Sequence, residues 1–181
     1  MNYCSNCAAP VEHLVPEGDD RPRYVCHACG LIHYQNPRLV VGCIPVWEDK
    51  ILLCLRDIQP RRGKWTLPAG YLENGETAME GARRESLEET GAKLNRLAPY
   101  LLFDIPHINQ LYLMFRARME SPAFHRTKES AQVRLFDSRE IPWDAIAFPV
   151  IEKTLQIYLA NRPGGEFPFQ IHPILTKMKQ E

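Results

Sequence analysis

Three glutamates are spaced to form one acidic face of a helix. Glu85, Glu88 and Glu89 stand at i, i+3 and i+4, so on a helix of 3.6 residues per turn their carboxylates project from one side. Like charges at these spacings repel by about 0.2 to 0.5 kcal/mol per pair, and a bound cation would remove that repulsion. Carboxylate oxygens suit Mg²⁺ or Mn²⁺, which also recruit substrate phosphates. The spacing indicates a divalent-metal site, with a solvated acidic face as the alternative.

The negative charge of the chain is concentrated around this triplet. Residues 70–92 hold six Glu and two Arg, a net of −4, whereas the 181-residue chain is neutral, with 22 Lys plus Arg and 22 Asp plus Glu. Because a neutral chain has no overall attraction to nucleic acid or anionic lipid, we expect neither as a partner. The longest nearly apolar stretch, residues 39–47, is far shorter than the roughly 20 residues of a membrane span.

Four cysteines form a second motif. Cys4-x2-Cys7 and Cys26-x2-Cys29 are separated by 18 residues, which is the spacing of a zinc ribbon, since each pair can offer two thiolates from one tight turn. Disulfides are the alternative. The first residues have neither the basic nor the apolar region of a secretion signal, so we expect a cytoplasmic, reducing location and a structural Zn²⁺.

The two remaining cysteines, Cys43 and Cys54, lie within apolar runs. Neither has the cationic surroundings of a nucleophile, so both are expected to be buried and inert.

The elements that must position these groups include more strands than helices. Helices are predicted at 77–90, which opens with a Thr-x-x-Glu capping box and ends at a glycine, and at 149–161. Strands are predicted at 11–15, 23–25, 39–46, 51–55, 97–105, 111–119 and 133–136. Because strands and helices do not alternate regularly, an α+β fold with a mixed sheet is favoured. We expect a ribbon over 1–36, a main domain over 37–162 and an extension over 163–181.

Seven residues of the acidic window stand at fixed spacing, Gly70-x5-Glu76-x7-Arg84-Glu85-x2-Glu88-Glu89-x-Gly91. They match the Nudix box, and the chain therefore resembles the Nudix hydrolases. The resemblance implies an α/β/α sandwich with a mixed β-sheet, preceded here by the small zinc ribbon. It also implies metal-dependent cleavage of a nucleoside diphosphate linked to another group.

The resemblance assigns roles to the matching residues. Glu85 and Glu89 become the principal Mg²⁺ or Mn²⁺ ligands, Glu88 shares the ions directly or through water, and Gly70 offers its backbone carbonyl. Ser86 departs from the aliphatic residue of the pattern, and we expect its hydroxyl to bond back to the carbonyl of Ala82.

Two further parts of the catalytic machinery follow from the resemblance. Glu76 and Arg84 would pair to orient the box, since the guanidinium fork suits a carboxylate. A general base is also needed. Glu129 is the candidate and Glu140 the second choice.

Aromatic and basic residues are candidates for substrate binding. Tyr71, Phe103, Tyr112 and Trp47 could stack on adenine or flavin, although strand aromatics commonly belong to the core. Arg56 and its neighbours Arg61, Arg62 and Lys64 could clamp phosphate, with solvated surface charge as the alternative.

The resemblance also suggests substrates. Segments such as 34–37, 40–43, 134–136 and 140–142 are similar to the plant-type FAD and ADP-ribose pyrophosphatases, which implies FAD or ADP-ribose as substrate and a homodimer. NADH pyrophosphatases share the plan of ribbon and box, but the signature that follows their box is absent at 97–104. A non-catalytic nucleotide sensor or nucleic-acid-binding regulator is an alternative of another class, which would be expected to lose box carboxylates.

Overall fold

The computed structural model describes residues 1–175 and divides into two compact units, the first ending at Pro37 and the second beginning at Arg38. The first unit is a three-stranded antiparallel sheet of β1 (Glu12–Leu14), β2 (Arg23–Val25) and β3 (Ile32–His33). The first two strands lie where the sequence places them. The third was not predicted, because two residues carry no periodic pattern.

The second unit is built on a mixed sheet with the strand order β10-β5-β4-β9-β8-β11. Its strands are β4 (Arg38–Trp47), β5 (Lys50–Arg56), β8 (Leu94–Ile105), β9 (Gln110–Met119), β10 (Ser130–Phe136) and β11 (Gln170–Pro173). Two short strands join it, β6 (Trp65–Thr66) beside β5 and β7 (Ala69–Tyr71) beside β4. The β4–β9 and β11–β8 pairs are parallel and the others antiparallel. The predicted mixed sheet is confirmed.

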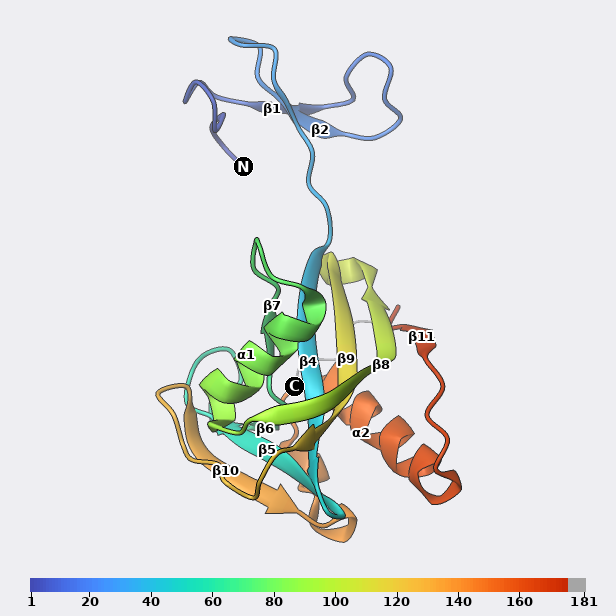
Figure 1. Ribbon diagram of the computed structural model, residues 1–181. Helices are drawn as coiled ribbons and strands as arrows, with labels where there is room; N and C mark the ends of the chain where they lie inside the picture. Colours follow the sequence, from blue (N-terminus) through green and yellow to red (C-terminus); the bar gives the residue numbers. More distant parts are fainter. Residues whose placement is uncertain (176–181) are drawn as a thin grey trace. The chain divides into compact units, whose positions relative to one another are not determined.

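Helices cover both faces of this sheet (Figure 1). Helix α1 (Ala78–Thr90) packs on one core cluster that includes Val41 and Leu52, and α2 (Pro149–Asn161) packs on the other, around Leu53 and Leu101. The layers are therefore α/β/α, as expected. The described part of this unit also contains four short 3₁₀ turns: Pro106–Ile108, Ser138–Glu140, Trp143–Ala145 and Arg162–Gly164. Within the described residues, no helix is long and apolar enough to cross a membrane.

The ends of α1 are fixed by the predicted signals. The Thr77 hydroxyl oxygen accepts a hydrogen bond from the Glu80 N–H, and the Glu80 carboxylate accepts one from the Thr77 N–H. Gly91 adopts the left-handed conformation at φ 68° and ends the helix. The prediction for Ser86 was wrong. Its hydroxyl donates to the carbonyl of Ala92 at 3.4 Å and not to Ala82, because the chain folds back after Gly91 and brings that carbonyl within reach.

The described part of the C-terminal segment continues the second unit. Strand β11 adds to the sheet edge alongside β8, and the Phe167 ring stacks on Tyr158 at 5.5 Å. The guanidinium of Arg116 lies 3.8 Å from the centroid of the same ring. This segment therefore packs along the edge of the sheet. Residues 176–181 of the predicted extension fall outside the described residues.

Candidate active site

Two of the three helix acids are buried where α1 meets the sheet. Glu85 is 8% exposed and Glu89 4%, whereas the Glu88 side chain is 53% exposed. The triplet is therefore not a uniformly solvated acidic face. Burying two carboxyl groups on successive turns is costly unless each has partners or a cation.

The strand β7 brings backbone groups against both buried acids. The N–H of Ala69 donates to Oε2 of Glu89 at 3.1 Å. The carboxylate of Glu85 lies so close to Gly70 that a Cβ atom there would come within 2.3 Å of Oε1. Only glycine leaves room for this carboxylate, which explains why the box begins with that residue.

Arg84 joins the remaining box residues into one network. Its guanidinium binds Glu76 in a bidentate pair, with Nε to Oε2 at 3.0 Å and Nη2 to Oε1 at 2.7 Å. Nη1 donates to Glu85 at 2.7 Å and to Glu88 at 3.0 Å, and Nη2 also reaches the carbonyl of Tyr71 at 3.1 Å. The Arg84 hydrogen bonds lower the pKa of Glu76 to about 2. The predicted Glu76–Arg84 pair is present, and Arg84 additionally holds two candidate metal ligands.

The buried acids resist ionisation. Burial, aided by the charges of Glu85 and Glu129, raises the pKa of Glu89 to about 8. Burial also raises the pKa of Glu85, and the charges of Glu88 and Glu129 add to this effect. A divalent cation would favour the ionised form of both groups. Their chemistry therefore fits a hard cation.

The oxygens of these three carboxylates do not all lie within 4.8 Å of one another. Within residues 1–175, the four ribbon cysteines form the one group of three or more potential ligands whose atoms all lie within 4.8 Å of one another. Glu85 and Glu88 are instead held by Arg84. The groups that could hold a divalent ion are the carboxylates of Glu85, Glu88 and Glu89 with the carbonyl of Gly70. Arg84 contacts one oxygen of Glu85 and one of Glu88, so the other oxygen of each remains for an ion.

The structure distinguishes between the two candidate bases. Glu129 is exposed just before β10, and its charge acts on both Glu85 and Glu89. Glu140 lies beyond the other end of that strand, where its carboxylate accepts a bond from Arg134 at 3.1 Å. Of these two candidates, Glu129 is the one whose charge raises the pKa of the buried acids.

The candidate substrate-binding residues are divided between the surface and the core. Tyr71 is 47% exposed, its hydroxyl accepts a bond from Gln110 at 2.8 Å, and Arg38 lies 5.7 Å from its ring centroid. Phe103 is fully buried beneath the ring of His172, so it offers no face to a ligand and we withdraw it from substrate binding. Trp47 likewise packs on the cluster under α1.

Arg56 and Tyr112 lie within electrostatic reach of one another. Burial raises the pKa of both Glu89 and Tyr112, and the charge of Arg56 lowers it by a smaller amount in each case. Arg56 also donates to the carbonyl of Pro60 at 2.9 Å. Two of the other loop cations have partners of their own, because Arg62 pairs with Asp57 at 2.7 Å and Lys64 donates to the carbonyl of Asp144 at 3.1 Å.

Sequence reasoning missed three contacts of the site. Arg38 and Gln110 flank Tyr71, and the thiol of Cys54 lies 3.8 Å from Oε2 of Glu89. The pairing of β4 with β7 and with β9 brings Arg38, Gln110 and Tyr71 together. No local pattern reports such contacts, because they depend on strand order.

The four ribbon cysteines form two matching turns. In each turn the first cysteine donates its N–H to the carbonyl five residues on, from Cys4 to Ala9 at 2.8 Å and from Cys26 to Leu31 at 2.9 Å. The Sγ atoms of Cys4 and Cys29 are 3.7 Å apart and those of Cys7 and Cys26 3.5 Å. A tetrahedral ion with Zn–S bonds of about 2.3 Å places its sulfurs about 3.8 Å apart. The cluster fits zinc, and all six cysteines are free.

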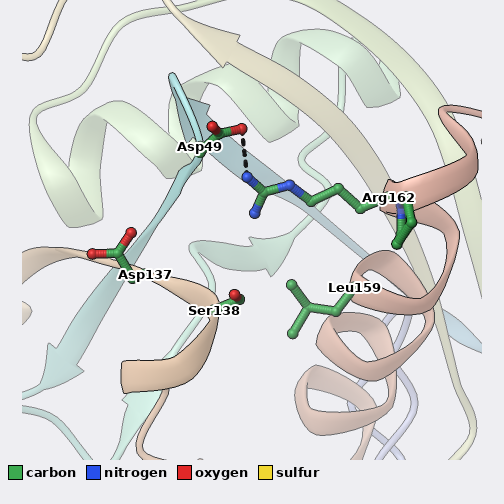
Figure 2. Close-up of a pocket in the computed structure, with 6 residues that line it drawn as sticks. Asp49, Asp137, Ser138, Leu159 and Arg162 are labelled. Carbon is green, nitrogen blue, oxygen red and sulfur yellow. Dashed lines mark hydrogen bonds and ion pairs between the residues drawn. The ribbon is translucent and has the colours of Figure 1, made fainter.

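A cavity of about 420 Å³ is lined by residues outside the box and is drawn in Figure 2. It is lined by Asp49, Asp137, Ser138, Leu159, Arg162 and Pro163. Arg162 donates to Asp49 across it, at 2.5 Å. None of the box residues contributes to this cavity, so we do not assign it to the reaction.

Fold and site together define a class. The chain matches the family profile described as "NUDIX domain" over residues 36–154 and the profile described as "Nudix N-terminal" over residues 2–35. The chain belongs to the Nudix hydrolase family and carries its N-terminal zinc-ribbon segment. The crystal structure of a NUDIX hydrolase from Nitrosomonas europaea is similar over 97% of this chain and 100% of that one, with a TM-score of 0.93 and 48% identity.

Several relatives have named activities, and two examples represent them. NAD-capped RNA hydrolase NudC of Photorhabdus laumondii is 29% identical over 160 residues, covering 84% of this chain and 60% of that protein. ADP-ribose pyrophosphatase of Methanocaldococcus jannaschii is 43% identical over 58 residues, covering 32% of this chain and 34% of that protein. The chain spans less than two thirds of the length of both relatives.

Proposed function

We propose that the chain hydrolyses the pyrophosphate bond of nucleoside diphosphate derivatives with Mg²⁺ or Mn²⁺, and that FAD and ADP-ribose are its substrates. The observation that carries this proposal is the buried pair Glu85 and Glu89, packed against the bare backbone of Gly70 and linked to Arg84. FAD would give FMN and AMP, and ADP-ribose would give ribose 5-phosphate and AMP.

The residues of the chain have distinct tasks in this reaction. When bound, the divalent ion supplies charge stabilisation to the pyrophosphate oxygens and acidifies water. Glu129 accepts the proton of the attacking water as its oxygen bonds to phosphorus and the bridging P–O bond breaks. Arg56 binds a phosphate oxygen, and Tyr71 and Tyr112 contact the remainder of the substrate. Arg84 holds the box in register through Glu76.

ADP-ribose is supported by the M. jannaschii relative, although that match covers only about a third of the chain. FAD rests on the resemblance of short sequence segments alone. A second candidate substrate is NADH or NAD-capped RNA. The NudC relatives of P. laumondii and Stutzerimonas stutzeri match 84% and 92% of the chain. Matches of this length include residues of both compact units. This candidate runs against our expectation that the chain has no nucleic-acid partner.

One panel separates these substrates. FAD, ADP-ribose, NADH and NAD-capped RNA are each incubated with the protein and Mg²⁺, and the products are separated by chromatography. Release of AMP from FAD or ADP-ribose supports the proposal. Turnover confined to NADH or capped RNA would replace it by the second candidate, and no turnover at all would favour a non-catalytic regulator.

The remaining assignments are also proposals. We infer that Cys4, Cys7, Cys26 and Cys29 hold a structural Zn²⁺ and that the protein is cytoplasmic. We also propose a homodimer, for which the support is family resemblance. Sedimentation at micromolar concentration tests it, since a species of 20.9 kDa would contradict a dimer.

A further inference from the structure

Cys54 lies within β5 and contacts an acid of the candidate metal site. The residue is 1% exposed, and its Sγ atom is 3.8 Å from Oε2 of Glu89. The thiol has one hydrogen and two acceptors within reach, since the carbonyl of Thr66 is 3.7 Å away. With Glu89 ionised, as a metal ligand must be, the carboxylate is the stronger acceptor because hydrogen bonds to charged groups are about twice as strong as neutral ones.

The same carboxylate oxygen receives a second bond. Oε2 of Glu89 also accepts the N–H of Ala69 at 3.1 Å. Two donors, one from β5 and one from β7, therefore converge on Oε2, whereas within residues 1–175 no hydrogen bond reaches Oε1. A carboxylate fixed through one oxygen presents the other in a defined direction.

We propose that Cys54 is a positioning residue of the divalent-metal site: its thiol and the Ala69 N–H hold Oε2 of Glu89, so that Oε1 faces the ion. This inference rests on the proposed function. Groups that orient a metal ligand in this way commonly change metal affinity by about 10- to 100-fold when they are removed. Because a thiol is a weak donor, we expect the lower end of that range.

The chain contains a matched control for this thiol. Cys43 is fully buried on the adjacent strand β4 and donates to the carbonyl of Ala82 in α1, also at 3.8 Å. Its acceptor is a backbone group, and no bond joins it to a box acid in the described residues. Cys43→Ala therefore removes a thiol from the same helix–sheet interface without disturbing Glu89.

The experiment compares Mn²⁺ binding in the full-length, zinc-loaded protein. Free Mn²⁺ is measured by electron paramagnetic resonance for the wild type, Cys54→Ala, Cys54→Ser and Cys43→Ala. We expect about tenfold weaker binding for Cys54→Ala, and values within about twofold of the wild type for the other two variants, because serine keeps a donor. If Cys54→Ala loses its thermal transition, Cys54→Val takes its place, since valine fills the site without a donor.

Three results would overturn the inference. They are wild-type affinity in Cys54→Ala, an equal loss in Cys43→Ala, or no rescue by serine. A wild-type protein that binds Mn²⁺ and cleaves its substrate keeps the proposed function standing in each case. A wild-type protein that takes up no Mn²⁺ overturns both.

Discussion

The carboxylate of Glu85 occupies the space that a side chain on Gly70 would need. A Cβ atom built on Gly70 would lie 2.3 Å from Oε1 and 2.4 Å from Oε2 of Glu85. The glycine is thus a requirement of close approach. The position of the Glu85 carboxylate therefore depends on the absence of a side chain at Gly70.

We therefore expect Gly70→Ala to displace Glu85 and to lower kcat/KM on the order of 100-fold, the loss that a displacement of about 1 Å can cause at a reacting centre. Steady-state kinetics with ADP-ribose measure the effect. Gly164→Ala is the control, because a Cβ atom there would meet nothing within 4 Å. Equal activity in both variants would contradict the role given to this contact.

Arg84 should not tolerate lysine. The guanidinium contacts Glu76, Glu85 and Glu88 at once, and a lysine ammonium cannot reproduce its planar fork. We expect Arg84→Lys to reduce kcat/KM by about tenfold or more. Arg83→Lys, at the exposed neighbouring position, should change it little, and a similar loss in both variants would argue against a specific network.

Metal affinity should depend on pH through Glu89. Its pKa is raised from 4.5 to about 8 by burial, and a protonated carboxyl cannot bind the ion, so Mn²⁺ affinity should increase up to about pH 8 and then level off. In the metal-free protein the folded state holds this proton more tightly than the unfolded chain. Stability should therefore fall as pH rises from about 4.5 to 8.

Thermal melts and Mn²⁺ titrations at several pH values measure both trends. Glu89→Gln is the control for the metal-free melts, because the amide does not titrate and the fall in stability should shrink. A wild-type Mn²⁺ affinity that is flat between pH 5 and 8 would rule out Glu89 as the group responsible.

Glu129 and Glu140 provide a matched pair for the general base. Both are exposed acids at the ends of β10, but only Glu129 influences the buried acids. Glu129→Gln should lower kcat by about 10²- to 10⁴-fold with little change in melting temperature. Glu140→Gln should keep wild-type kcat. The reverse outcome would reassign the base to the second candidate.

Much of this architecture follows from local sequence signals. The capping box at Thr77 and the glycine at position 91 set the ends of α1, and alternating or apolar runs set most strands, because these features act over a few residues. The spacing of the box acids likewise indicates the candidate metal site without any tertiary information.

What the sequence could not specify depends on contacts between distant segments. Phe103 looks like any strand aromatic until β11 places His172 over its ring. Cys54 looks like an inert core thiol until α1 brings Glu89 against it. Strand order and helix placement decide such contacts, and neither is encoded in a local pattern.

The most direct test of the account is the release of AMP by Glu85→Gln. The substitution keeps the shape of a side chain that is 11% exposed but removes the charge that would hold the ion. We predict that Mg²⁺-dependent AMP release from FAD or ADP-ribose disappears while the melting temperature stays close to that of the wild type. Undiminished turnover in this variant would show that the buried acids of α1 are not the catalytic centre.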